Sequence, residues 1–273
     1  MHPILEKFNG FIFDLDGTIY RGSKPIPSVQ KVFDTLNKLG KKYVFVSNRT
    51  TLTPEDYKIK LESMGIPCEI DQIITSAEVT AKFLAQNYNE SSIFVIGEEK
   101  FIKFLRSFGL NIVNDKSEKE LNNIKINDFY ADIVLVSLDR NLHYQKILMA
   151  QAALLKEAKF FAANIDFTCP VEEGEILDAG YTISVLEKLT NRKLDSYFGK
   201  PSKYIFHKII EKLNVNSKKM ILFGDRLETD ILMAKENKIK SVLVLSGVRN
   251  KINLNEYLVK PDFILNSVVD LLN

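Results

Sequence analysis

The chain alternates short apolar runs with segments of helical periodicity, and this alternation limits the folds open to it. Residues 11–13 are typical of a strand buried on both faces, and apolar residues recur at helical spacing over 27–39. Residues 43–46 form the next apolar run, and Thr53 precedes Pro54 as the expected N-cap of another helix. Strands and helices in alternation predict a parallel sheet with helices on both faces.

The same alternation returns later in the chain. Near the C-terminus we expect strands at 220–223, 241–245 and 263–265 and a helix at 227–236. The middle of the chain has its own series, with strands expected at 93–96, 133–136 and 159–162 and helices at 101–108 and 142–156. We therefore predict a Rossmann-like α/β core formed by residues 1–77 and 191–273, with a second α/β domain, residues 78–190, inserted into it.

Composition excludes several classes of protein. Hydrophobic residues make up 45% and charged residues 26% of the 273 residues, as in an ordinary globular protein. The formal charge is only +2 and the lysines are scattered, which argues against nucleic acid as a partner. No apolar run has the length of a signal peptide or a membrane span, so we expect no membrane partner and a cytoplasmic location. The two cysteines, Cys68 and Cys169, are expected to be free thiols.

Polar residues follow several of the expected strands. Asp14 and Asp16 come after the first strand, Ser47 and Asn48 after the second, and Asp225 after a C-terminal strand. Ligands of open parallel sheets bind outside the carboxyl ends of the strands, so these side chains should converge on one crevice.

Two carboxylates at one strand end suit a reaction in which Asp14 attacks and Asp16 protonates the leaving group. A carboxylate that attacks a phosphate monoester needs a cation to offset repulsion, and Mg²⁺ prefers oxygen ligands. Asp14, the main-chain carbonyl of Asp16, and Asp225 could supply them. The alternative is that the segment 14–18, Asp-Leu-Asp-Gly-Thr, is only a polar turn after a strand.

Four segments resemble, in order, the four motifs of the haloacid-dehalogenase-like (HAD) hydrolase superfamily. Residues 13–18, Phe-Asp-Leu-Asp-Gly-Thr, match the first motif, and Ser47 stands at the second. Lys200, between Gly and Pro, stands at the third, and residues 224–230, Gly-Asp-Arg-Leu-Glu-Thr-Asp, match the fourth.

The resemblance implies a role for each matched residue. Asp14 would become an aspartyl phosphate and Asp16 would act as acid and base. The phosphoryl oxygens would be held by Ser47, Asn48 and Lys200, and Mg²⁺ would be bound by Asp14, Asp16 and Asp225, with Asp230 in support. Taken singly, Ser47 and Asn48 could form a turn, Lys200 could lie on the surface and Asp230 could face outward from a helix.

The inserted domain lies between the second and third motifs, where this superfamily places a C2-type cap. Asn164 and Asp166 resemble an Asn-Pro-Asp signature of a substrate loop, with Ile165 in place of Pro, although both also suit a turn. That signature belongs to the subfamily of the N-acetylglucosamine-operon and para-nitrophenyl phosphatases. Residues 46–49, 79–81, 95–98 and 224–230 look most like the sugar phosphatases of bacterial arabinose operons.

The resemblance implies a Mg²⁺-dependent phosphatase for a small phosphorylated metabolite, with a sugar phosphate as the expected class. Phosphoglycolate, glycerol phosphate and pyridoxal phosphate stay open as substrates, and a homodimer through the cap is a further option. The alternatives are a phosphomutase, a protein phosphatase and a non-catalytic protein that binds a phosphorylated ligand. A dehalogenase or a P-type ATPase is disfavoured, because each is expected to lack an acid at the position of Asp16.

Overall fold

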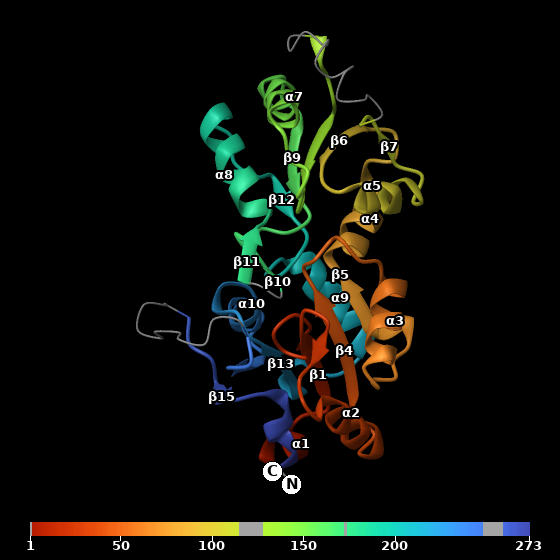
Figure 1. The fold of residues 1–273 in the computed structure, drawn as a ribbon, viewed down its shortest axis with the longest axis vertical. Coiled ribbons are helices and arrows are strands. Elements are labelled where there is room, and N and C mark those ends of the chain that lie inside the picture. Colours follow the sequence, from red (N-terminus) through yellow and green to blue (C-terminus); the bar gives the residue numbers. More distant parts are fainter. Residues whose placement is uncertain (1, 115–127, 172–173, 248–258) are drawn as a thin grey trace.

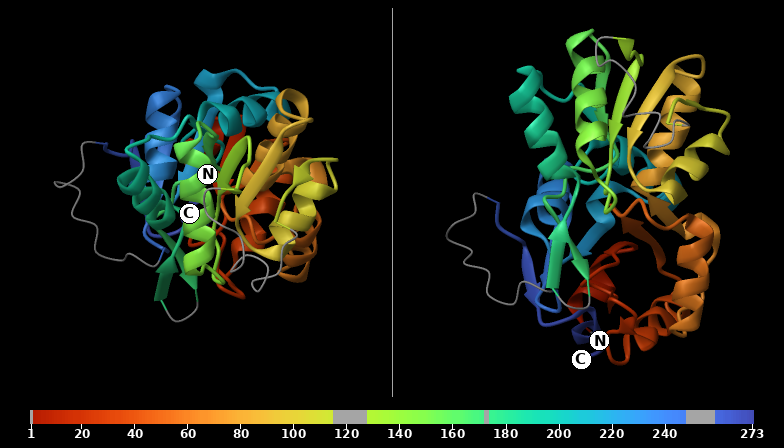
Figure 2. Two further views of the ribbon diagram at one scale, coloured as in Figure 1. Left: turned by 90° about the horizontal axis from the view of Figure 1, so that it is seen from above. Right: turned by 45° about the horizontal axis from the view of Figure 1, so that its top comes forward.

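The computed structural model describes residues 2–114, 128–171, 174–247 and 259–273, which form two lobes, each built on a parallel sheet (Figure 1). The lobes stack end to end, and the second of them lies at the end away from the two termini (Figure 2). Both termini lie close together at the free end of the first lobe (Figure 1). Among the described residues, each helix is too short or too polar to cross a lipid bilayer.

The sheet of the first lobe, which we call the core, has six strands that all run parallel. In sheet order the strands are β15 (Phe263–Leu265), β14 (Lys240–Val244), β13 (Met220–Gly224), β1 (Gly10–Asp14), β4 (Lys42–Ser47) and β5 (Ile73–Thr75). Segments from both ends of the chain therefore meet at β1 in the middle of one sheet.

The core sheet is buried on both faces because its strands carry apolar side chains at successive positions. Phe11 and Phe13 of β1 pack into one apolar cluster, while Ile12 between them packs into another on the opposite face. The helices and turns of this lobe are α1 (Pro3–Lys7), α2 (Val29–Lys38), α3 (Pro54–Ser63), η1 (Ile70–Gln72), α9 (Lys203–Leu213), η3 (Ser217–Lys219), α10 (Leu232–Glu236) and η6 (Val268–Leu272). A two-stranded ribbon of β2 (Tyr20–Arg21) and β3 (Lys24–Pro25) follows β1.

The residues expected to begin and end helices in this lobe do so in the structure. Thr53 caps α3 and forms a reciprocal capping box with Asp56, in which each side chain accepts from the other residue's backbone N–H. Gly40 has a positive φ of 63° just after α2, as a helix-ending glycine should.

The sheet of the second lobe, which we call the cap, has five parallel strands. Apolar side chains of α4 and α5 pack on one face and those of α7 and α8 on the other. In sheet order the strands are β12 (Ser196–Tyr197), β9 (Lys159–Ala162), β8 (Ile133–Val136), β6 (Ser92–Ile96) and β7 (Asn111–Ile112), and the helices are α4 (Ser76–Asn87), α5 (Glu99–Arg106), α7 (Tyr144–Leu155) and α8 (Ala179–Thr190).

An antiparallel hairpin of β10 (Thr168–Val171) and β11 (Gly174–Leu177) extends from the cap towards the core (Figure 1). It is absent from the sequence-based expectations because its strands are short and half exposed. The expected domain limits stay a prediction: the one at 77/78 falls inside α4, and the one at 190/191 comes just before β12, which pairs in the cap sheet.

Parallel sheets covered by helices on both faces confirm the predicted fold class. One apolar cluster is shared by the lobes, since it includes Ile12 of the core sheet and Val95 of the cap sheet. The single helix expected over 227–236 is divided into a π-helical turn, η4 (Leu227–Ile231), and α10. Such turns are often found at functional sites.

Candidate active site

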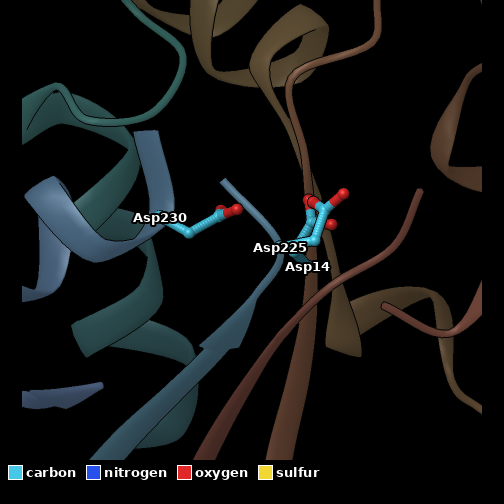
Figure 3. A group of neighbouring side chains, drawn as sticks. All are labelled: Asp14, Asp225 and Asp230. Atoms are coloured by element: carbon cyan, nitrogen blue, oxygen red, sulfur yellow. The ribbon is translucent and has the colours of Figure 1, made fainter. Parts of the chain in front are cut away.

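Three buried carboxyl groups meet at the carboxyl ends of the central strands. Asp14 is the last residue of β1, and Asp225 directly follows the neighbouring strand β13. Asp230 reaches the same point from η4. Carboxylate oxygens of the three residues all lie within 4.8 Å of one another, and Figure 3 shows Asp230 pointing towards Asp14 and Asp225.

The ammonium group of Lys200 lies among these acids. Its Nζ donates to Oδ1 of Asp14 and, at 2.7 Å, to Oδ1 of Asp230. Lys200 is buried, just before α9. The lysine of the third predicted motif therefore contacts acids of the first and the fourth motif, although these segments are separated in the sequence.

Burial governs the ionisation of this cluster. It raises the pKa of Asp14 to about 7, against the effect of Lys200 and with added repulsion from Asp230 and Asp16. Burial also raises the pKa of Asp225 well above its ordinary value, and Asp14 and Asp230 add to this shift. Although burial opposes the charge of Lys200, its two carboxylate neighbours raise its pKa above the usual range. The cluster thus has three acids and one ammonium group, so a further positive charge would stabilise the ionised carboxylates.

Two glycines allow the acids to approach one another. Gly17 has a φ of 92°, which other residues rarely adopt, and a Cβ there would clash with the carboxylate of Asp225. A Cβ on Gly224 would collide with the side chain of Asp230. Both glycines of the matched motifs are therefore needed for close packing.

Asp16 lines the same pocket but has other partners than this cluster. Its Oδ2 accepts from the hydroxyl of Tyr20 at 3.1 Å, and its Oδ1 lies 3.4 Å from Nη1 of Arg49. Because Asp14 and Asp16 have different neighbours, the two carboxyl groups are able to serve different functions.

Ser47 and Asn48, at the end of β4, line the same pocket as Asp14. The hydroxyl of Ser47 hydrogen-bonds to the hydroxyl of Tyr57 at 2.7 Å. Asn48 accepts from the backbone N–H of Lys200 at 2.6 Å, and its amide donates to the Lys200 carbonyl at 3.0 Å and to Asp166 at 2.7 Å. Asn48 therefore holds the backbone of Lys200 and links it to the cap.

The two cap residues singled out in the sequence have different positions. Asp166 lines the pocket and accepts hydrogen bonds from Asn48 and, at 3.1 Å, from Asn164. Asn164 is buried behind it and also donates to Asp178 at 3.0 Å. Burial raises the pKa of Asp178 to about 6, and the neighbouring Asp166 adds to the shift.

Residues that the sequence analysis did not select also line the pocket. Arg49 and Arg226 extend from the core to the hairpin of the cap, where Cys169 and Pro170 contact Arg49. Both arginines adjoin matched motifs, at the second and in the fourth, and this adjacency was the available signal. The pocket between these core and cap residues has a volume of about 40 Å³.

Comparison with known proteins agrees with this geometry. A family model described as haloacid dehalogenase-like hydrolase matches residues 11–111, and a HAD-hydrolase-like model matches residues 197–271. The sugar phosphatase AraL of Bacillus subtilis is 31% identical over 261 residues, which are 96% of this chain and 91% of that protein. The chain belongs to the haloacid dehalogenase-like hydrolase family.

Solved structures of HAD-like hydrolases have the same fold. The 4-nitrophenylphosphatase of Thermotoga maritima is 31% identical with a TM-score of 0.86, covering 99% of this chain and 98% of that one. A glycerol phosphate phosphatase of Mycobacterium tuberculosis, determined in complex with magnesium, is 24% identical with a TM-score of 0.81 and covers 99% and 78%. The predicted family membership is confirmed, together with the cap between the second and third motifs.

Proposed function

We propose that this chain is a Mg²⁺-dependent phosphatase that hydrolyses a small phosphorylated metabolite with Asp14 as its covalent nucleophile. The observation that carries the proposal is the group of three buried carboxylates around one ammonium, at the end of β1 and beneath the cap. The named relatives, which are sugar and nitrophenyl phosphatases, support it.

The acid cluster fits a magnesium ion. Its donors are carboxylate oxygens, which Mg²⁺ prefers, and burial together with the neighbouring carboxylates raises the pKa of Asp14 and of Asp225 although Lys200 opposes the shift. Asp14, Asp225 and the main-chain carbonyl of Asp16 would hold the ion, and Asp230 would support the site through Lys200. When bound, Mg²⁺ offsets the charge of the phosphoryl group.

The reaction would proceed in two steps. In the first, a carboxylate oxygen of Asp14 forms a bond to phosphorus while the bond to the leaving oxygen breaks, and Asp16 gives that oxygen a proton. In the second, Asp16 takes a proton from water, whose oxygen attacks phosphorus, releases inorganic phosphate and restores Asp14. Ser47, Asn48 and Lys200 would hold the phosphoryl oxygens, and Asn48 also keeps Lys200 in position.

The shape of the site supports a small substrate of the sugar phosphate class. A second cavity of about 230 Å³ shares Arg49 and Pro170 with the acid pocket and is also lined by core and cap residues, including Ser23, Leu138 and Arg140. We place the leaving group there. A cavity of this size suits a sugar or polyol and excludes a folded protein as substrate.

We also propose a homodimer through the cap. Tyr181, Val185 and Leu189 lie at successive turns of α8, and each is between 45% and 47% exposed. A second copy packed on this row would bury its apolar surface. Light scattering after gel filtration should give twice the monomer mass for the native protein and the monomer mass for Val185→Glu.

The cytoplasmic location remains a prediction of the sequence.

The deciding experiment is phosphate release from para-nitrophenyl phosphate and a panel of sugar phosphates, with and without Mg²⁺. We expect Mg²⁺-dependent turnover that Asp14→Asn abolishes. Turnover retained by Asp14→Asn would reject the covalent route. Phosphate transfer to a sugar without release would indicate a mutase, and binding without any reaction would indicate a non-catalytic protein.

A further inference from the structure

The side chain of Arg49 connects the core and the cap at the edge of the acid pocket. On the core side its Nη1 lies 3.4 Å from Oδ1 of Asp16. On the cap side its Nη2 donates to Sγ of Cys169 at 2.9 Å and to the carbonyl oxygen of Pro170 at 2.7 Å. One guanidinium group therefore contacts the proposed proton donor and the hairpin that covers it.

The two oxygens of Asp16 are held from different sides. Oδ2 accepts from the hydroxyl of Tyr20, which is fully buried in the core. Oδ1 forms an ion pair with Arg49, whereas the ammonium of Lys60, which lies over the ring of Tyr20, interacts with the charge of Asp16 but forms no ion pair with it among the described residues. The orientation of the Asp16 carboxyl group thus depends on the Tyr20 hydroxyl at one oxygen and on the position of the guanidinium at the other.

The charge of Arg49 is directed towards Asp16. Burial opposes the charged form, but the charge of Asp16 raises the pKa of Arg49 above its usual range. Burial raises the pKa of the Cys169 thiol to about 11, so the cap offers Arg49 a neutral thiol and a carbonyl. The cap thereby fixes the position of the guanidinium without competing for its charge.

Arg226 provides an internal comparison. It reaches the same hairpin, donating to the carbonyl oxygen of Thr168 at 2.9 Å and pairing with Glu175 at 3.2 Å. Its side chain is 13% exposed, against 19% for Arg49. Among the described residues its ion-pair partners are Asp166 and Glu175, not Asp16. Two similar arginines thus hold one hairpin, and the contact with Asp16 distinguishes Arg49.

We propose that Arg49 is a positioning residue that couples closure of the cap to the orientation of Asp16. The inference rests on the proposed function, in which Asp16 gives a proton to the leaving oxygen. When the hairpin lies over the pocket, Cys169 and Pro170 fix the guanidinium, and the guanidinium fixes Oδ1 of Asp16. Proton donation is then aligned once the substrate is enclosed.

The test compares two substrates of similar shape that depend differently on an acid. Para-nitrophenolate leaves readily without a proton, whereas phenolate from phenyl phosphate benefits more from one. We expect Arg49→Met to lower kcat/KM for phenyl phosphate about tenfold more than for para-nitrophenyl phosphate, within the range of general acid catalysis. Asp16→Asn should increase the ratio of kcat/KM for para-nitrophenyl phosphate to kcat/KM for phenyl phosphate by a larger factor than Arg49→Met does. Arg226→Met should lower both values by the same factor.

Two further variants keep the test decisive. Arg49→Lys should show an intermediate ratio, because it retains the charge but not the forked reach. Cys169→Ala removes one contact between the cap and Arg49 but leaves Arg49 and Asp16 in place. We expect it to shift the same ratio by a smaller factor. It replaces Arg49→Met as the test if circular dichroism shows that Arg49→Met does not fold.

Equal losses for both substrates in Arg49→Met, or no loss at all, would overturn the inference. The proposed function is judged separately by Asp14→Asn. Inactivity of Asp14→Asn together with an unchanged ratio in Arg49→Met rejects the role of Arg49 alone, whereas turnover by Asp14→Asn rejects the mechanism on which it rests.

Discussion

The two walls of the pocket differ in how they are built. The core wall carries four ionisable groups: Lys200 forms ion pairs with Asp14 and Asp230, and carboxylate oxygens of Asp14, Asp225 and Asp230 lie within 4.8 Å of one another. The cap wall presents Asp166, a neutral thiol and backbone carbonyls, and these are held by side chains that extend from the core. The difference suggests that the core supplies the electrostatics of the reaction, while the cap supplies enclosure and selection.

The largest effect should come from the core wall. Lys200→Met removes the cation that faces Asp14 and Asp230, so we expect kcat/KM to fall by about 10²–10³-fold or more for each substrate alike. Steady-state kinetics on para-nitrophenyl phosphate and a sugar phosphate would measure it. Lys203→Met, at an exposed lysine three residues along, is the matched control and should retain activity. A loss of activity on only one substrate would mean that the core wall selects substrates, which would contradict the division of functions between the two walls.

The second effect is on stability without metal. Because the pKa of Asp14 is about 7 when folded and about 3.8 when unfolded, the folded state binds more protons between these values. The metal-free protein should therefore lose stability as the pH rises from about 4 to about 7. In EDTA, Asp14→Asn should raise Tm at pH 8 by about 5 °C or more, but not at pH 4.

Thermal melts with EDTA and with Mg²⁺ at the two pH values would measure this change. Mg²⁺ should raise Tm of the native protein at pH 8, because it supplies the missing positive charge. It should raise Tm of Asp14→Asn by less. Identical pH dependence in the native protein and in Asp14→Asn would contradict the electrostatic strain assigned to the core wall.

A change in the cap wall should act on stability through hydrogen bonding. Asn164→Ala removes the buried donor shared by Asp166 and Asp178, so we expect a loss of about 1–3 kcal/mol in the free energy of unfolding. Urea denaturation would measure the loss, with the exposed Asn87→Ala as control. An unchanged midpoint would show that the cap does not depend on this network.

The smallest effect is expected at the rim of the cap. Glu175→Gln weakens a partly exposed ion pair with Arg226, and such pairs contribute about 0–1 kcal/mol. We expect KM to change by less than about fivefold and kcat to stay the same. A large fall in kcat would mean that the rim contributes to the chemical step, which would remove the distinction between the two walls.

The core wall could be read from the sequence because its residues follow apolar strands within short motifs. Asp14, Lys200 and Asp225 are each fixed to a strand or helix end, and parallel strands bring such ends together. The contact of Asp230 with Lys200 also depends on the π-helical turn of η4. A periodicity of 3.6 residues does not reveal such a turn.

The cap wall could be predicted only in part. Asp166 was found by its motif, but the contacts of Arg49 and Arg226 depend on where a short hairpin lies over another lobe. That placement follows from packing between distant segments, which local patterns do not encode. Asn48 stays a predicted phosphate ligand, and its contacts with Lys200 and Asp166 depend on the same packing between distant segments.

The order of strands in the core sheet has a consequence for synthesis on the ribosome. The strands of the cap sheet follow one another in the chain. All of them are therefore made before the core strands β13, β14 and β15. β1 lacks its neighbour β13 until then, and Asp14 is made long before Asp225 and Asp230. Nascent chains and chains truncated before residue 225 should therefore be inert, because the reactive centre is completed only after β13 and η4 have been made.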